Sequence, residues 1–371
     1  MKSTSGEYYQ GLDHIRAMAA FMVFSWHFVH IGNASVPYEY VPTFPLASLF
    51  EEGHTGVALF MTLSGYLFAK MLNGKQIIYK YFFFNRALRL LPLLVLVIFI
   101  VGLRKYFEGE NIAAYAASIA KGVVMPTLPN GGWSITIEAH FYLILPLLFL
   151  ISAQNHNRLL LIILAFVLLR TAIFLTTGTV QYLSYWTIIG RIDQFIFGMI
   201  LSYWSPFLKG RHISALLVAI IFCIYYWMFN LAGGFYKIVQ YPSPSPIWII
   251  MPTIEGFGYA FLIAYYDETF QFSNALWARA LALIGTISYS IYLIHFFFYG
   301  PMVKFIHAHI MSIDNYPTAF LWSVVGFLLT CPIAYASYRF VETPFLRFRR
   351  PYTIKSNSIQ ERSESLSTKT A

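Results

Sequence analysis

DHIRAMAAFMVFSWH, residues 13–27, is the stretch that decides the fold. It is an apolar run with an arginine near one end and a histidine at the other. Arg16 and His27 are eleven residues apart, almost three turns of an α-helix, so their side chains share one face. They are separated by roughly 16 Å along the axis, about half of a bilayer core. Because ionisable side chains inside a membrane are costly, this face is predicted to line a functional passage.

The composition is that of a polytopic membrane protein. The 371 residues are 58% hydrophobic and 19% aromatic, and only 11% are charged, whereas soluble domains carry about 25% charged residues. The net charge is +9. The Lys and Arg residues stand between apolar spans rather than on one soluble face, so they indicate membrane topology and not a nucleic-acid partner. No zinc-type or P-loop spacing occurs, and no metal site is predicted.

The distribution of basic residues predicts the topology. The loop 33–53 contains no Lys or Arg, whereas the connection 70–89 contains five. The first loop is therefore placed outside and the second inside, with a cytoplasmic N-terminus. The N-terminal segment is interpreted as a retained span rather than a signal peptide, because no small-residue cleavage site follows it.

Residues 111–126 leave two span counts open. Counting them as a span gives eleven spans and an external, basic C-terminus. Treating them as an interfacial or re-entrant segment gives ten spans, with both termini cytoplasmic, and keeps the charge bias along the whole chain. We therefore predict an all-α protein with about ten transmembrane helices. They are expected at about 14–32, 54–70, 89–107, 133–153, 158–177, 185–204, 212–232, 246–266, 280–300 and 317–338. Residues 1–348 form one transmembrane domain, and the polar, Ser-rich residues 349–371 are predicted to be a disordered cytoplasmic tail.

Six motifs follow one another between residues 13 and 345. They are DHIR at 13–16 with its Arg-ten-residues-His pattern, GVALFMTLSGYLFAK at 56–70, NRALRLLP at 85–92, WSITIEAHFYLILP at 133–146, ISYSIYLIHF at 287–296 and SYRFVETPF at 337–345. Together they resemble the acyltransferase-3 family of bacterial membrane O-acyltransferases. The chain departs from the usual motifs at His14, where the family commonly has Gly, and at His140, where Gln is common.

The resemblance implies a function. Such a protein would move an acyl group, most often acetyl, from cytoplasmic acyl-CoA to a hydroxyl of an extracytoplasmic or lipid-linked glycan. It would lie in the bacterial inner membrane, in the form without a fused extracytoplasmic domain. Acyl-CoA would be a co-substrate, with no tightly bound cofactor. Lipopolysaccharide, peptidoglycan and other glycans all remain open as acceptors.

The first-helix motif supplies the candidate catalytic residues. A neutral imidazole at His27 can take a proton from a hydroxyl; the alternative is a histidine that only packs between helices. Arg16 would support the donor or the active arrangement, with a snorkelling interfacial arginine as the alternative. The resemblance adds Asp13, from the same motif.

The donor is expected to bind near the third span. Arg86 and Arg89 are at i and i+3, so they are neighbours on one helix surface. Guanidinium groups suit phosphates, which CoA carries at the end away from its thioester. The alternative is the ordinary enrichment of arginine at cytoplasmic helix ends. Ser64, Gly65 and Tyr66, at the centre of the second-helix motif, are added as donor-binding residues by the resemblance.

Further candidates stand in the later motifs. Glu138 is an acid in an apolar segment, which either orients the acceptor or pairs with a buried arginine such as Arg170 or Arg191. Its neighbours Trp133 and Ser134 are candidate substrate-binding residues, as are Tyr289 and Tyr292. These two tyrosines share one face with His295, which either assists catalysis or forms a structural hydrogen bond. Arg191 and Asp193 are too close in sequence to face each other on a helix, so each needs a partner elsewhere.

Two other classes compete with the enzyme. Intramembrane Arg, His and Glu also mark transport pathways, so a transporter or flippase for a lipid-linked glycan or an acylated small molecule is the alternative. No inverted repeat or pair of interrupted helices favours it. A catalytically inactive scaffold is the third possibility, and it would tolerate His27→Ala.

Overall fold

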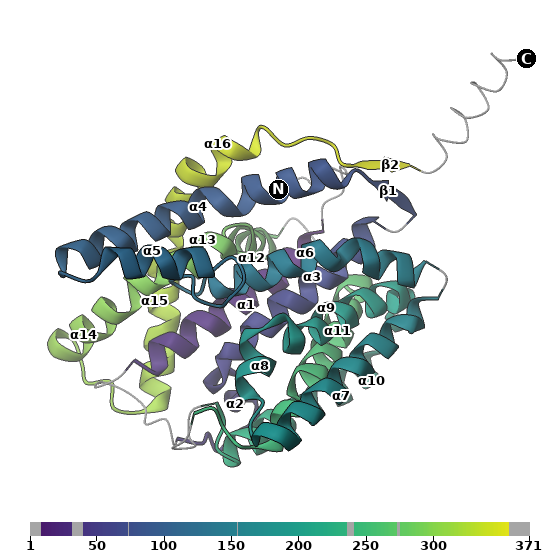
Figure 1. Ribbon diagram of the computed structural model, residues 1–371. Helices are drawn as coiled ribbons and strands as arrows, with labels where there is room; N and C mark the ends of the chain where they lie inside the picture. The colour runs from purple at the N-terminus through teal and green to yellow at the C-terminus, as the bar shows by residue number, and fades with distance from the viewer. Residues whose placement is uncertain are drawn as a thin grey trace, which may run out of the picture.

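The computed structural model describes residues 9–31, 40–72, 74–153, 155–235, 241–272 and 275–355, and these residues are almost entirely helical. The longer helices are α1 Gln10–Val29, α3 Gly56–Leu72, α4 Tyr79–Phe107, α5 Ile112–Lys121, α6 Trp133–Ser152, α7 Leu159–Thr177, α9 Ile188–Trp204, α10 His212–Leu231, α11 Met251–Thr269, α12 Leu276–Thr286, α14 Tyr299–His309 and α15 Tyr316–Ser337 (Figure 1). The short ones are α2 Pro45–Glu51, α8 Gln181–Trp186, α13 Ser288–Ile294 and α16 Thr343–Leu346. Two short strands, β1 Lys75–Ile77 and β2 Thr353–Lys355, pair antiparallel.

Helices α3 and α9 form the centre of the bundle through small residues. A Cβ at Gly65 would lie 2.0 Å from the carbonyl oxygen of Phe195, and one at Gly198 would lie 2.1 Å from that of Thr62. Only glycine permits backbones to approach so closely, as is common between membrane helices. Helix α11 packs on the same pair, and α1 packs on α3.

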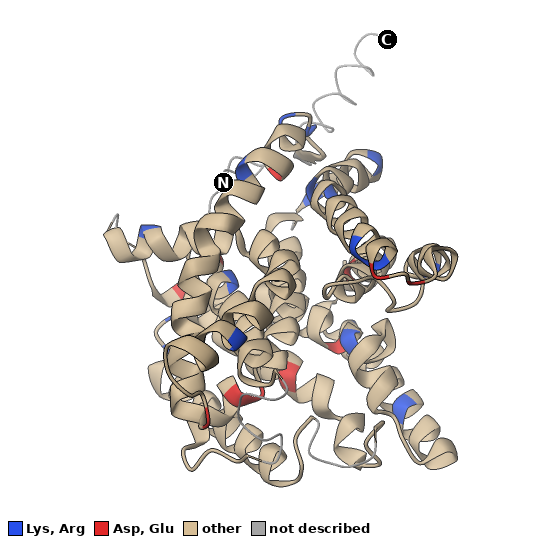
Figure 2. Cartoon of the chain, turned by 90° about the vertical axis from the view of Figure 1, so that its left-hand side faces the viewer, with Lys and Arg blue, Asp and Glu red and all other residues tan. Residues whose placement is uncertain are grey.

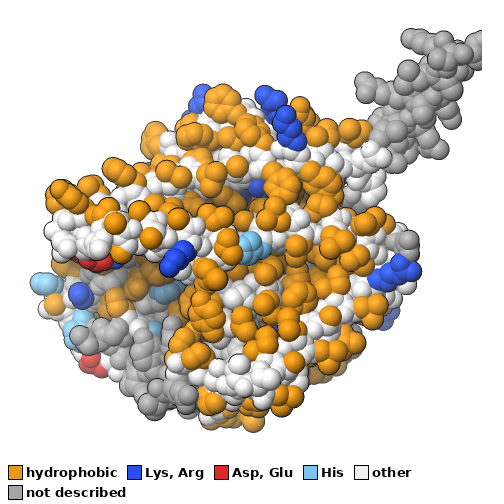
Figure 3. All heavy atoms as spheres, viewed as in Figure 1, with side chains coloured by type: hydrophobic (Ala, Val, Ile, Leu, Met, Phe, Trp, Pro, Cys, Tyr) orange, Lys and Arg blue, Asp and Glu red, His pale blue; other side chains and the backbone are white. Residues whose placement is uncertain are grey.

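The outer helices present apolar side chains outward. Leu161 and Leu175 of α7 are 65% and 77% exposed, and Ile213 of α10 is 76% exposed. Figure 3 shows hydrophobic side chains across one whole face, and Figure 2 shows only scattered charged residues on the outer helices. Such a surface is rare on soluble monomers and fits a lipid environment. The chain therefore has the character of a multi-pass membrane protein.

The number of spans differs from the prediction. Among the described residues, six helices are long and apolar enough to cross a membrane, or up to seven if α12 and α13, bent by 52°, form one span. The predicted count of ten and the cytoplasmic position of both termini are not confirmed. Helices α1, α9 and α11 lie where spans were expected, but they are not among the six.

Helices α9 and α11 carry polar side chains that form a buried hydrogen-bond network. Glu255 of α11 accepts hydrogen bonds from Thr55 at 2.8 Å, Tyr226 at 2.7 Å and Gln194 at 2.7 Å, and its other neighbour is Arg191 at 3.4 Å. Central helices face other helices rather than lipid, so they can carry polar side chains where these find partners.

Residues 111–126 do not form a long helix. Helix α5 is ten residues long, which is about 15 Å and half of a bilayer core. It packs along α4, where the hydroxyl of Tyr115 donates to the carbonyl of Ile98 at 2.9 Å.

The predicted tail begins inside the fold. Residues 353–355 form β2, and Tyr352 is 3% exposed. In residues 349–355, backbone pairing and one buried aromatic ring thus accompany a polar composition. The rest of the predicted tail lies outside the described residues.

Candidate active site

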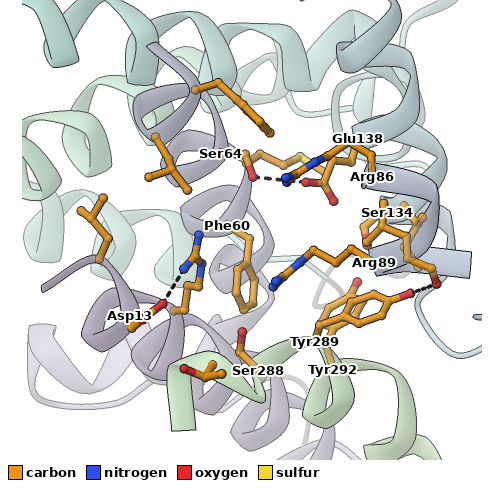
Figure 4. Close-up of a pocket in the computed structure, with 18 of the residues that line it drawn as sticks. Asp13, Phe60, Ser64, Arg86, Arg89, Ser134, Glu138, Ser288, Tyr289 and Tyr292 are labelled. Carbon is orange, nitrogen blue, oxygen red and sulfur yellow. Dashed lines mark hydrogen bonds and ion pairs between the residues drawn. The ribbon is translucent and has the colours of Figure 1, made fainter. Parts of the chain in front are cut away.

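A cavity of about 210 Å³ opens between α1, α3, α4, α6 and α13, and we call it the arginine cavity. Its polar lining includes Arg16, Ser64, Arg86, Arg89, Ser134 and Glu138. In Figure 4, Arg86 and Arg89 extend from their helix toward Ser64 and Phe60 on the facing side. Several of the predicted site residues, from five separate motifs, are thus brought to one place.

Arg86 and Arg89 carry charge into this cavity but form no direct ion pair with a protein group that the structure describes. Within the described residues, neither guanidinium forms a hydrogen bond or an ion pair with another protein group, and the buried Nε of Arg86 has no partner. The guanidinium of Arg86 lies 5.3 Å from the ring centre of Phe68 and 5.8 Å from that of Phe82. Buried donors normally have acceptors. The arrangement therefore suits an anion that enters from outside the chain.

Three other charged groups of the cavity, Asp13, Arg16 and Glu138, have protein partners. Arg16 forms an ion pair with Asp13, one turn away on α1. Glu138 accepts a hydrogen bond from Tyr142 and another from Ser64 at 3.4 Å. The suggested pairing of Glu138 with Arg170 or Arg191 is not found, because those arginines contact Asp193 and Glu255 instead.

A second cavity of about 190 Å³ contains His27, and we call it the histidine cavity. Three tryptophans, Trp26, Trp133 and Trp186, line it together with Tyr185, Phe235 and Phe296. His54 lines it too; its Nε2 lies 3.1 Å from Glu52, and its buried Nδ1 has no hydrogen-bond partner among the described residues. The wall of this cavity is therefore mainly aromatic, with His27 and His54 among its polar groups.

The ring of His27 is held in one orientation. Its Nδ1 lies 2.8 Å from the carbonyl oxygen of Val23 and 3.3 Å from Nε2 of His295. A carbonyl can only accept, so the proton belongs on Nδ1 and the lone pair on Nε2. The ring also packs edge-to-face on Phe296, with centroids 4.6 Å apart. His27 thus has the tautomer required of a general base.

The two cavities adjoin each other, because Val57 and Tyr292 line both of them. The start of α6 lies at the same junction, because Trp133 lines the histidine cavity and the next residue, Ser134, lines the arginine cavity. The hydroxyl of Tyr292 donates to the carbonyl of Gly131 at 3.1 Å, which ties α13 to the loop before α6. The two arginines and His27 therefore lie in neighbouring cavities that share part of their walls.

A family model described as an acyltransferase domain matches residues 9–339. The chain belongs to the acyltransferase-3 family. The resemblance deduced from the six motifs is thereby confirmed.

The acyltransferase-3 relatives include O-acetyltransferases of bacteria. The chain is 26% identical over 393 residues to "O-acetyltransferase OatA" of Staphylococcus aureus, an alignment that covers 92% of this chain and 58% of the relative. It is 26% identical over 380 residues to "Peptidoglycan O-acetyltransferase OatA" of Listeria monocytogenes, covering 92% of this chain and 56% of the relative. The chain thus spans a little over half the length of these relatives. No solved structure matches it.

Two predicted donor-binding residues of this acyltransferase-3 chain pack between helices. Gly65 lies against the backbone of α9, as described above. Tyr66 is fully buried, and its hydroxyl donates to Asp267 at 2.8 Å. Neither lines the two cavities, whereas their neighbour Ser64 does. Gly65 and Tyr66 therefore hold the α3 wall of the arginine cavity in place.

The remaining predicted residues lie at the junction or beside it. Tyr289 lines the arginine cavity, and its hydroxyl donates to the carbonyl of Leu90 at 2.6 Å. His295 is 1% exposed and touches the site through His27. No group of three or more His, Cys, Asp or Glu among the described residues is arranged to hold a metal ion.

Among the lining residues that sequence reasoning missed are two with ionisable side chains, His54 and Arg349. His54 stands two residues before the second-helix motif. The only sign of it in the sequence is a histidine at the start of an apolar run. Arg349 lines the arginine cavity but stands in the segment predicted to be disordered. Composition alone predicts that such a polar segment is solvated, and it does not predict contacts between the segment and the helices.

Proposed function

We propose that this chain transfers an acetyl group from cytoplasmic acetyl-CoA to a hydroxyl of a cell-envelope glycan, with His27 as the general base. Membership of the acyltransferase-3 family and the O-acetyltransferase relatives support O-acetyl transfer. The name of the Listeria relative makes peptidoglycan the first acceptor to test.

The observation that carries the proposal is that the two cavities adjoin each other, with Tyr292 in the wall of both. The phosphates of CoA bind Arg86 and Arg89 in the arginine cavity, where charge-assisted bonds to guanidinium groups are strong. The pantetheine arm runs past Ser134 and Tyr292, and the thioester then reaches the histidine cavity. The acceptor sugar lies against the aromatic side chains there, with its hydroxyl beside His27.

The chemistry needs one proton transfer on each side of the acyl transfer. Nε2 of His27 takes the proton of the acceptor hydroxyl while its oxygen attacks the thioester carbonyl carbon. The carbon–sulfur bond then breaks, the ester remains on the sugar, and the CoA thiolate takes up the proton. The carbonyl of Val23 keeps the opposite ring nitrogen protonated, so Nε2 is available in each cycle.

Acetyl transfer in membranes tests the proposal. Membranes carrying the chain are incubated with acetyl-labelled acetyl-CoA and peptidoglycan, beside His27→Ala at equal expression. His309→Ala, an exposed histidine of α14, is the matched control. We expect label in the glycan with wild type and His309→Ala but not with His27→Ala. Equal labelling by His27→Ala removes His27 from its role, and acceptor movement across the membrane without CoA consumption would favour the transporter.

A further inference from the structure

Residues 347–355 form an extended segment after α16, which we call the C-terminal strap. It runs along the N-terminal part of α4 and ends in β2, beside β1 (Figure 1). The family match ends at residue 339, so the whole strap lies beyond it.

The strap is attached to α4 next to the proposed phosphate-binding arginines. The side chain of Asn85 donates to the carbonyl of Arg350 at 2.7 Å and accepts from its backbone N–H at 3.0 Å. The backbone N–H of Ile78 donates to the carbonyl of Tyr352 at 2.8 Å. Asn85 is 1% exposed and directly precedes Arg86. The position of the strap is thus fixed by the same helical turn that positions Arg86.

The attached strap contributes to the wall of the arginine cavity. Arg349 and Tyr352 both line it, together with Arg86 and Arg89. The ring of Tyr352 packs edge-to-face on Phe82, the same ring that Arg86 covers. Burial, and then the charges of Arg89 and Arg86, lower the pKa of Arg349 to about 10. Arg349 nevertheless stays protonated at neutral pH, so three positive charges face one hollow.

The next residue provides a contrast within the strap. The guanidinium of Arg350 lies 5.5 Å from the ring centre of Tyr81 and 5.9 Å from that of Phe84, and its side chain is exposed. Arg350 does not line the arginine cavity. Two adjacent arginines therefore point to different places, and only Arg349 reaches the hollow.

We propose that the C-terminal strap completes the donor site, with Arg349 binding a phosphate group of CoA beside Arg86 and Arg89. The proposal rests on the proposed function, since it takes acetyl-CoA as the donor. A third guanidinium suits a ligand with more than one phosphate group, because each phosphate can then have its own charged partner. The mutual repulsion of the three arginines is relieved when such an anion binds.

Binding of CoA to the purified full-length protein tests the strap. Isothermal titration in detergent or nanodiscs compares wild type with Arg349→Ala, Arg349→Lys and Arg350→Ala. We expect Arg349→Ala to raise the Kd for CoA about tenfold or more, the range of a lost charge-assisted hydrogen bond. Arg349→Lys keeps the charge but not the planar fork, so its loss should be smaller. Arg350→Ala should stay within about twofold of wild type. Thermal unfolding midpoints show whether each variant is folded.

The outcomes separate the two proposals. If wild type binds CoA and Arg349→Ala binds it equally well, the strap proposal is overturned and the donor proposal stands. Equal losses for Arg349→Ala and Arg350→Ala also overturn it, because the effect would then be general basic charge. If wild type binds no CoA, the donor assignment fails, and the role of the strap fails with it. Should Arg349→Ala prove unfolded, the comparison of Arg349→Lys with Arg350→Ala decides in the same way.

Discussion

Nε2 of His295 lies 3.3 Å from Nδ1 of His27, although 268 residues separate them in the chain. The other ring nitrogen of His295 lies 3.1 Å from the carbonyl oxygen of Ile291, which places its proton there and leaves Nε2 as an acceptor. His295 therefore points a lone pair at the Nδ1–H of His27. It acts as a positioning residue for the proposed base.

We expect His295→Leu to lower kcat for acetyl transfer about tenfold, because one hydrogen bond that orients His27 is lost. His295→Gln keeps an acceptor oxygen and should retain most of the rate. The KM for acetyl-CoA should change little in both, since the phosphate end of the donor is far from this pair. Steady-state kinetics with labelled acetyl-CoA measures both constants. Equal losses in the two variants would assign His295 to packing alone.

Arg86→Gln and Arg89→Gln test the donor end of the passage. Each should raise the KM for acetyl-CoA about tenfold or more, with a smaller effect on kcat, because a phosphate contact stabilises the bound donor before and during transfer. Arg104→Gln on the same helix is the control, since its side chain is 70% exposed and pairs with Glu108. If all three variants change the KM alike, Arg86 and Arg89 do not bind the donor and instead reflect the enrichment of arginine at cytoplasmic helix ends.

His54 offers a prediction about the acceptor. Its buried Nδ1 has no hydrogen-bond partner in the described part of the chain, and His54 lines the histidine cavity, where a sugar hydroxyl can supply the missing hydrogen bond. His54→Phe keeps an aromatic ring in place and should raise the KM for the acceptor about tenfold while leaving that for acetyl-CoA unchanged. Initial rates measured over a range of acceptor concentrations give the answer. A change in the donor KM instead would move His54 out of the acceptor site.

Several features followed from the sequence because they depend on local rules. Side chains two residues apart on a helix point apart, so Arg191 and Asp193 had to find separate partners. The structure confirms this, with Arg191 facing Glu255 at 3.4 Å and Asp193 facing Arg170 at 2.7 Å. The helical class and the family followed from composition and from six motifs in order. The single face of Arg16 and His27 likewise places one side chain in each of the two cavities.

Other features depend on contacts between distant parts of the chain. Span counting evaluates each helix alone, so it could not tell that α9 and α11 are surrounded by other helices. The role of Gly65 could not be read from its motif, because a glycine serves ligand approach and helix packing equally well. The strap was missed because its polar composition indicates disorder, whereas its backbone is bound by Asn85 and by β1.

The ion pair between Arg170 and Asp193 is expected to affect the stability of the protein rather than its activity. Both side chains are 0% exposed, and Arg170 also donates to the carbonyl of Ile249 at 2.8 Å. Arg170→Met leaves the carboxylate of Asp193 buried with only Thr253 as a hydrogen-bonding side chain. We expect it to lower the free energy of unfolding by about 3–5 kcal/mol. Denaturant unfolding in detergent micelles measures the loss.

The double variant Arg170→Met/Asp193→Leu separates the cost of an unpaired charge from the value of the pair. Removing both charged groups leaves no uncompensated carboxylate, and an apolar pair of similar volume is often as stable as a buried ion pair. We therefore expect the double variant to recover most of the stability lost in Arg170→Met. A double variant as unstable as the single one would mean that the bonds of Arg170 to the backbone, above all to Ile249, hold α7 against the end of the loop before α11. Its acetyl transfer per folded molecule should equal that of wild type, since neither residue lines the two cavities.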